Sequence, residues 1–583
     1  MKHLFSKKHI SLFIMTLITA CLVSGIIIGC QKQTAPASSS NASFEEFTDT
    51  LFRQEISANT ISLHYTLQDP DSYGILDAPV TYGSFNTSAI EPTAALENCL
   101  AVLHSFSAAE LSTDNQITYA ILEQYLQTAL EGSAFSLYEE PLCPLTGIQA
   151  QLPILLSEFR LSETKDIDTY LALIKTTPEY FDSLLQFQKA RSDSGLFMSD
   201  YALDQIITEC SSFINMADQN YLYSSFTDRL EDIESLSDSD REQYLVQNTQ
   251  AIEEYVFPAY QSLIDGLEEF RSTCVNQKGL CYLPDGDKYY NYVVKRETGS
   301  SRSIKELKSL TTSQIQSDLS AIQNILTKHP DITAAQTSNI SQTNPTSILN
   351  ELETKMAGVF PDNAKINTRI KYVPEDMQNY VSPAFYLIPT IDNTFDNVIY
   401  INPGNTVGGL DLFTTLAHEG YPGHLYQTTY YANTSPAPIR SILNFGGYVE
   451  GWATYAEMCS YYLTDLPKEE VTLMQHNSSV ILGIYALADI GIHHEGWSLL
   501  ETVAFFQQYG VSDTETVEQI YYLIIADPAN YLKYYIGYLE FLELKKEALT
   551  LWGDSFSQEK FHEAVLNIGP APFDIIRKYA IIP

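Results

Sequence analysis

The residues of this chain that are best suited to chemistry lie in its second half, where two histidines and two glutamates form a pattern typical of metal sites. His418 and Glu419 begin the stretch HEGYPGH, His424 ends it, and Glu450 follows in the stretch EGWATYAE. In zinc hydrolases that carry H-E-x-x-H, two histidines one helical turn apart bind the metal, and the glutamate beside the first histidine acts as general base. The residues therefore predict a zinc site with His418, His424 and Glu450 as ligands and Glu419 as the base.

The two histidines stand at i, i+6 rather than at i, i+4. At about 100° per residue, i+4 returns to within about 40° of the starting face of a helix, whereas i+6 lands about 120° away. A regular helix therefore cannot present both imidazoles to one metal. Pro422 lacks an N–H and clashes with the preceding turn, while Gly420 and Gly423 accept unusual dihedral angles. We expect the helix to break or bulge here, and a two-residue bulge would return His424 to the face of His418.

The stretch EGWATYAE is helical in pattern, so Glu450 and Glu457 share one face. Glu457 can therefore hold the imidazole of a ligand histidine without itself binding the metal. The alternative is a surface helix that ends at a Gly/Pro turn and carries histidines without a function. The combination of H-E-G-x-P-G-H with a downstream E-G-W is hard to obtain by accident, which favours the metal site.

Five stretches resemble the bacterial family known as domain of unknown function 885. They are HEGYPGH, YVEGWATYAE, DIGIHHEGW, PANYLKYYIGYLEFLELKKEA and FHEAVLNIGPAP, and the resemblance is strongest from about Ser382 to the C-terminus. Members of the family are similar to zinc peptidases of the thimet oligopeptidase and Taq-type carboxypeptidase kind. The resemblance implies a mainly α, zincin-like (gluzincin) helical metallopeptidase fold with a deep cleft.

Two further residues could stabilise the oxyanion of a tetrahedral intermediate. Adjacent His493 and His494 point to different sides of a helix, so at most one faces the cleft, and the resemblance favours His493. Tyr534 matches the tyrosine that the family places three residues before Gly537, although the next family position is usually Lys and is Tyr in this chain. The chain has 39 tyrosines, and packing in the core is the alternative role for Tyr534.

Between Tyr372 and Pro403 the pattern changes to short β-type runs. AFYLIPT and NVIYIN are separated by residues 391–396, which predicts a small hairpin or sheet immediately before the helix that carries His418. An extended peptide could pair with an edge strand there through main-chain hydrogen bonds. A purely structural hairpin is the alternative.

The N-terminus predicts export. Lys2, Lys7 and Lys8 precede an apolar run from Ile10 to Gly29, the layout of a signal peptide. Because Cys30 follows a small residue, as at a bacterial lipoprotein cleavage site, we expect an exported protein anchored to the cell membrane by lipid at Cys30. An uncleaved signal anchor is the alternative, since the run is near the length that spans a bilayer.

The length of 583 residues favours two or more substructures or one large helical enzyme. We predict a signal peptide (1–29), a flexible tether (30–43), an N-terminal helical region that forms one wall of the cleft (44–270) and a catalytic region (271–583). A formal net charge of −39 makes nucleic acid an unsuitable partner. Cys274 and Cys281 are close enough in sequence to form a disulfide, but the sequence is equally compatible with two free thiols.

Together these observations predict an extracytoplasmic metallopeptidase that carries one Zn²⁺ per chain and hydrolyses peptide bonds in short peptides. One alternative is a peptide-binding lipoprotein without catalysis, which would leave Glu419 without a role and for which an α/β pattern is usual. Another is a zinc amidase that acts on a non-peptide or cell-wall amide.

Overall fold

The computed structural model is mainly helical and describes residues 40–582 except 331, 333–341, 374, 376, 377, 379–381, 406 and 407. The predicted signal peptide, Cys30 and most of the predicted tether lie outside the described residues. Helix α3 (Asn41–Ile56) is capped by Ser40, whose side chain accepts a hydrogen bond from the backbone N–H of Ser43. Residues 41–43 are therefore the first turn of a helix and not part of a tether. In the part of the chain described, no helix is long and apolar enough to cross a membrane.

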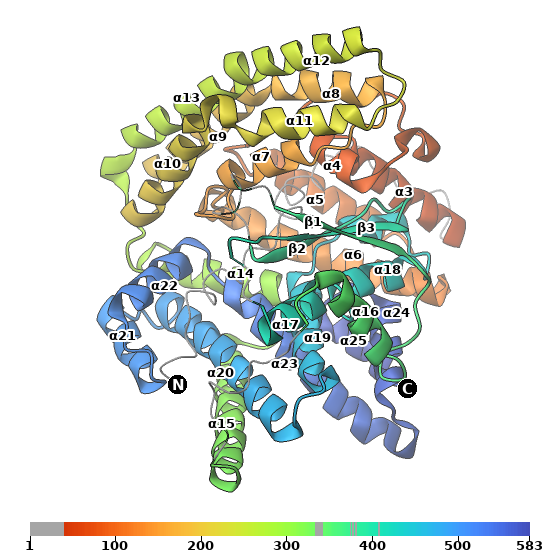
Figure 1. Ribbon diagram of the computed structural model, residues 1–583, viewed down its shortest axis with the longest axis vertical. Coiled ribbons are helices and arrows are strands. Elements are labelled where there is room, and N and C mark those ends of the chain that lie inside the picture. Colours follow the sequence, from red (N-terminus) through yellow and green to blue (C-terminus); the bar gives the residue numbers. More distant parts are fainter. Residues whose placement is uncertain are drawn as a thin grey trace.

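The first half of the chain consists of short and medium helices (Figure 1). After α3 these are α4 (Thr60–Thr66), α5 (Ile90–Leu103), α6 (Thr113–Gly132), α7 (Ile148–Ser157), α8 (Thr164–Ile174), α9 (Thr177–Asp193), α10 (Asp200–Asn215), α11 (Tyr221–Glu231), α12 (Asp238–Ala251) and α13 (Phe257–Glu269).

The second half contains the longest helices and the sheet. The helices are α14 (Gly286–Thr298), α15 (Ile304–Lys328), α16 (Pro345–Lys355), α17 (Leu410–Glu419), α18 (His424–Ala432), α19 (Gly446–Ser460), α20 (Lys468–His493), α21 (Leu499–Gln508), α22 (Thr514–Ala526), α23 (Asn530–Trp552), α24 (Gln558–Ile568) and α25 (Phe573–Ile576).

The chain packs around two hydrophobic cores that do not divide at residue 270. The smaller core is formed mainly by α7 to α13, which lie at the top of Figure 1. The larger core joins α3, α5 and α6 to the helices that follow residue 280. The predicted N-terminal region therefore contributes to both cores. Helices such as α8, α10 and α13 each carry an apolar face, but periodicity alone could not tell which core such a helix would join.

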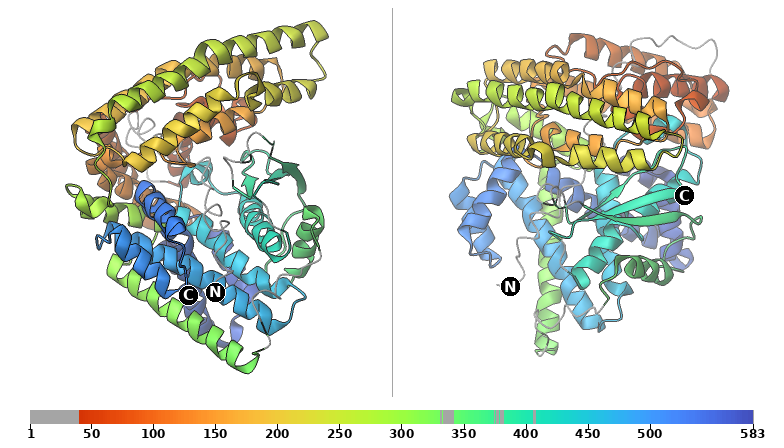
Figure 2. Two further views of the ribbon diagram at one scale, coloured as in Figure 1. Left: turned by 60° about the vertical axis from the view of Figure 1, so that its left-hand side comes forward. Right: turned by 45° about the horizontal axis from the view of Figure 1, so that its top comes forward.

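The two predicted strands are present and antiparallel, and a third strand joins them. β2 (Ala384–Leu387) pairs with β3 (Asp396–Ile401), and β3 pairs in parallel with β1 (Asn367–Tyr372) in the order β1-β3-β2. β1 was not predicted, because its sequence NTRIKY is polar and mostly exposed. Phe385 and Tyr400 are register partners whose stacked rings lie 4.7 Å apart and belong to the smaller core. The sheet therefore lies between that core and α17, which contacts β2 (Figure 2).

Helices α19 and α23 cross with their backbones in contact. A Cβ atom on Gly451 would lie 2.5 Å from the Cα atom of Gly537, and one on Gly537 would overlap the carbonyl oxygen of Gly447. Only glycine fits such a crossing without moving the helices apart. The crossing brings the residues that precede Gly537 on α23 close to Glu450 on α19.

The two cysteines that could have formed a disulfide are not bonded to each other. Cys274 and Cys281 are both free thiols of intermediate burial. Burial raises the pKa of each thiol, so both favour the protonated, less reactive form.

Candidate metal centre

The two histidines of HEGYPGH lie on separate helices. α17 ends at Glu419 and α18 begins at His424, so residues 420–423 form a turn between two helices. The prediction of a break is confirmed, and the alternative of a two-residue bulge within one helix is wrong. A Cβ atom on Gly423 would overlap the carbonyl oxygen of His418, so the turn folds back tightly against the end of α17. The turn, and not the periodicity of a single helix, therefore places both imidazoles on the same side.

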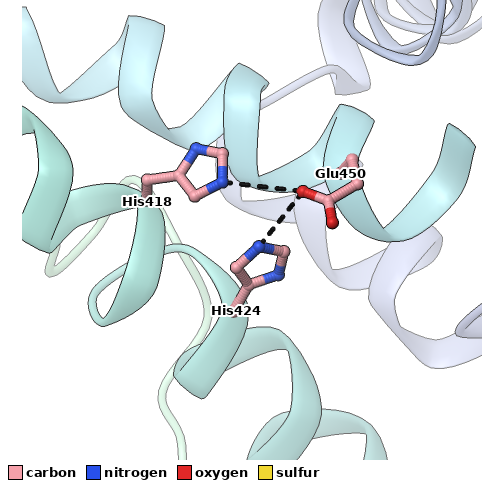
Figure 3. A group of neighbouring side chains, drawn as sticks. All are labelled: His418, His424 and Glu450. Carbon is pink, nitrogen blue, oxygen red and sulfur yellow. Dashed lines mark ion pairs between the residues drawn. The ribbon is translucent and has the colours of Figure 1, made fainter. Parts of the chain in front are cut away.

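Both histidines face Glu450, which projects from α19 (Figure 3). The Oε2 atom of Glu450 lies 3.7 Å from Nε2 of His418 and 3.4 Å from Nε2 of His424. The imidazole rings are 4.8 Å apart and nearly perpendicular, at 80°. All three side chains are buried or nearly so, and one ligand atom from each lies within 4.8 Å of the others. The structure therefore brings the three predicted ligands together.

The distance between two of the ligand atoms is the one expected around a tetrahedral zinc ion. Nitrogen and oxygen ligands bind zinc at about 2.0–2.2 Å, so two neighbouring ligand atoms stand roughly 3.3–3.5 Å apart. Nε2 of His424 and Oε2 of Glu450 are at that separation, and within the described residues neither buried atom has a hydrogen-bond partner. A cation between them would satisfy both, together with His418.

The charges in the group formed by His418, His424 and Glu450 are strongly coupled. Burial by itself lowers the pKa of His418, but the nearby carboxylates of Glu450 and Glu457 outweigh it and raise the pKa to about 10. Burial alone would raise the pKa of Glu450, but the two histidines lower it to about 2. Without a metal, His418 is therefore protonated at neutral pH and Glu450 is ionised. In the metal-free protein, the proton on His418 supplies part of the positive charge that a bound cation would bring to Glu450.

Glu419 lies beside the three ligands and is held by the sheet. Its Oε2 atom accepts a hydrogen bond of 3.0 Å from the backbone N–H of Tyr386 on β2. The side chain is buried, and burial raises the pKa of its carboxyl group to about 7. A carboxyl group with such a pKa can both accept and release a proton near neutral pH, which is what a general base and acid requires.

Glu457 and Tyr534 also reach the group. Oε2 of Glu457 lies 3.2 Å from Nδ1 of His418, as expected for a carboxylate that orients a ligand histidine. The ring of Tyr534 stacks at 6.4 Å from the ring of His418. Burial raises the pKa of its phenol well above the usual value, so Tyr534 stays neutral and can donate a hydrogen bond.

A small cavity adjoins these side chains. Its volume is about 20 Å³, and its lining residues are Ser382, Pro383, Ala384, Thr415, His418, Glu419, Glu457 and Tyr534. A cavity needs about 10–15 Å³ to hold one water molecule, so this one has room for about one. The described residues thus enclose the group closely, and the deep cleft expected beside it stays a prediction.

His493 does not belong to the group. Its ring stacks on Tyr290, its Nδ1 atom accepts a hydrogen bond from the backbone N–H of Leu280, and its Nε2 atom lies 2.8 Å from the carbonyl oxygen of Ile524. Both ring nitrogens are thus engaged by backbone groups, and burial lowers the pKa of the imidazole to about 4. The prediction that His493 faces a cleft and stabilises an oxyanion is wrong, because the side chain joins three segments of the core instead. His494 is exposed.

Two contacts at the site were not predicted from the sequence. The backbone N–H of Tyr386 holds Glu419, and the indole N–H of Trp452 donates a hydrogen bond of 2.9 Å to the carbonyl oxygen of Pro422. A backbone donor leaves no trace in a sequence. Trp452 had a signal, since it follows Glu450 by two residues in the E-G-W motif and the chain has only 3 tryptophans.

Comparison with known proteins gives a family and two similar structures. Residues 87–579 match the model of a family described as bacterial protein of unknown function, DUF885. A solved structure described as a "putative lipoprotein" from Colwellia psychrerythraea has a TM-score of 0.80 and 19% identity, covering 93% of this chain and 99% of that chain. A second solved structure, from Shewanella oneidensis, is described as a "putative lipoprotein of unknown function". It has a TM-score of 0.64 and 17% identity, covering 93% of this chain and 99% of that chain. No curated protein sequence matches. At these identities the two structures show that the fold is shared.

Proposed function

Since the chain belongs to the bacterial DUF885 family, to which no activity is assigned, its function must be inferred from the site, and we propose a zinc metallopeptidase of the gluzincin kind. The observation that carries the proposal is the convergence of His418, His424 and Glu450 within 4.8 Å, with Glu419 directly after the first histidine. Two imidazoles and one carboxylate form a three-ligand site that leaves one position open, which is the composition of catalytic zinc sites.

A zinc ion held by these ligands would act as a Lewis acid and lower the pKa of a bound water molecule. Glu419 takes the proton from the attacking water, because its carboxylate lies beside the ligands and its pKa is near 7. It then delivers the proton to the leaving amine. Tyr534 donates a hydrogen bond to the oxyanion, and Glu457 keeps the ring of His418 in orientation.

The surroundings of the site support short, extended substrates. The cavity has a volume of about 20 Å³, which is room for about one water molecule, so a substrate would approach the ligands from beside the cavity and would not fill it. β2 is an edge strand whose residue Ala384 lines that cavity, so an extended peptide could lie beside it. The amide N–H of Tyr386 is already bonded to Glu419, so such a peptide would use the neighbouring backbone groups.

The proposed location is the outer face of the cell membrane, with a lipid anchor at Cys30. The lipoprotein pattern at the N-terminus supports this location, and each of the two similar structures is described as a "putative lipoprotein". A short-peptide hydrolase at that location would act on peptides outside the cytoplasm.

The function is tested by metal analysis together with digestion of a mixed peptide library, followed by mass spectrometry. We expect about one zinc per chain in the parent and cleavage of short peptides. His424→Ala should lose zinc and activity together, because two ligands rarely hold a catalytic zinc. Full zinc occupancy in His424→Ala would refute the ligand set. Zinc binding by the parent without peptide cleavage, but with cleavage of cell-wall fragments added as a second library, would identify an amidase instead.

Zinc binding should become tighter as the pH rises. His418 must lose its proton to bind the metal, and the pKa of about 10 in the metal-free protein means that the proton is present at neutral pH. Displacing one proton raises the apparent affinity about tenfold per pH unit between pH 7 and pH 9. Isothermal titration calorimetry in buffers of different ionisation enthalpy measures the released proton. Glu457→Gln removes one of the two carboxylates that hold the proton, so it should flatten this dependence, and a parent that releases no proton would contradict the prediction.

A further inference from the structure

We infer that Trp452 is a positioning residue for the metal centre: its indole holds the turn between the two histidines and thereby sets the direction of His424. This inference rests on the proposed function, since it assigns a role in metal binding. It starts from the hydrogen bond of 2.9 Å from the indole N–H to the carbonyl oxygen of Pro422.

The indole has a fixed orientation. Trp452 is fully buried, and three rings meet it edge-on: Phe360 at 6.1 Å, Phe541 at 5.7 Å and His562 at 5.7 Å. Edge-to-face contacts of this kind are favourable and directional. A ring enclosed in this way cannot rotate without moving its neighbours, so its N–H points to one place. The donor thus acts as a fixed support for the turn.

Helix α19 therefore holds the turn at two points. Glu450 faces Nε2 of His424 at 3.4 Å, and two residues later Trp452 binds the carbonyl of Pro422, which precedes His424 by two residues. One contact is a side chain that faces the ligand, and the other is a hydrogen bond to the backbone just before it. Together they fix the first residues of α18 relative to Glu450.

The two histidines are then positioned in different ways by the same helix. Glu457 on α19 contacts the ring of His418 directly, at 3.2 Å from Nδ1. Trp452 acts on His424 through the backbone of the turn. Residues that orient metal ligands from outside the coordination shell typically change metal affinity by tenfold to a hundredfold when they are lost. We expect an effect of that size for Trp452.

The test compares metal binding by the full chain with and without the indole N–H. Trp452→Phe keeps an aromatic ring but has no donor. Site-specific replacement of Trp452 by β-(3-benzothienyl)alanine keeps the bicyclic shape and puts sulfur in place of the N–H, which guards against a folding defect. In both variants the Zn²⁺ affinity, measured by competition with a chelator, should fall about tenfold to a hundredfold. The visible spectrum of the Co²⁺-loaded protein should also change, because it reports the arrangement of the ligands.

The matched control is Phe573→Leu. Phe573 is buried and packs against Phe541 at 5.2 Å, but it is not one of the three rings that orient the indole, so this variant should unfold at a lower temperature and keep the parental Zn²⁺ affinity and Co²⁺ spectrum. Parental affinity and spectrum in both Trp452 variants would overturn the inference and leave the proposed function standing. An equal loss of affinity in Phe573→Leu would also overturn it, because packing would then explain both results. A parent chain that binds neither metal would refute the proposed function, and the inference with it.

Discussion

Glu419→Gln should slow peptide hydrolysis by about 10²- to 10⁴-fold while zinc remains bound. The amide can neither accept a proton from water nor deliver one to the leaving amine, and general acid–base catalysis contributes about that much. The ligand group does not include Glu419, so metal binding is preserved. The fold should also survive, since the glutamine carbonyl can still accept the hydrogen bond from the backbone N–H of Tyr386.

The measurement is single-turnover cleavage of a peptide found in the library, with zinc content determined on the same sample. Glu457→Gln is the control, because Glu457 lines the same cavity and contacts His418 but is not the proposed base. It should weaken zinc binding more than it slows the zinc-loaded enzyme. Near-parental cleavage by zinc-loaded Glu419→Gln would mean that another group is the base.

Deletion of Tyr421 and Pro422 should remove zinc binding, even though it produces HEGGH with the i, i+4 spacing of ordinary zinc hydrolases. The expectation follows from the turn: residues 420–423 connect two separate helices and are not extra residues within one. Removing two residues shortens the path by up to about 7 Å, so α18 must shift or unwind at its start. The deletion also removes the carbonyl that Trp452 binds.

Zinc affinity should fall by at least about a hundredfold, because the deletion displaces His424 and also removes the hydrogen bond by which Trp452 holds the turn before it. The metal-free protein should also unfold at a lower temperature, and both quantities are measured on the same preparation. Pro422→Ala keeps the number of residues and the carbonyl, so its affinity should stay much closer to that of the parent. A deletion variant that binds zinc and cleaves peptides as the parent does would show that the turn is dispensable.

The meeting of His418, His424 and Glu450 could be predicted from sequence, because residue type and helical geometry together constrain it. The i, i+6 spacing excluded a regular helix, and Pro422 with its flanking glycines indicated where the helix ends. Whether that interruption would be a bulge or a turn could not be decided. The choice depends on how closely the chain folds back onto the carbonyl of His418, which is a tertiary contact.

His493 shows where such reasoning fails. A histidine in a helix next to a metal motif looks the same in sequence whether it faces a substrate or the core. Its role is decided by Leu280 and Ile524, two backbone partners that lie far away along the chain. The division of the N-terminal helices between two cores was out of reach for the same reason, because an apolar stripe indicates that a helix is buried but not against which partner.

The crossing of α19 and α23 bears on how such a site can persist while the rest of a sequence drifts. At Gly451 and Gly537 the backbones of α19 and α23 are in direct contact. The spacing between Glu450 and Tyr534 therefore does not depend on the size of any intervening side chain. Substitutions elsewhere in the larger core can then accumulate and be compensated locally without altering that spacing. Chains with 19% identity and a TM-score of 0.80 show how far the surrounding sequence can diverge on one fold. On this fold, the glycine positions at the crossing tolerate no side chain, whereas the neighbouring apolar positions can exchange for others of similar volume.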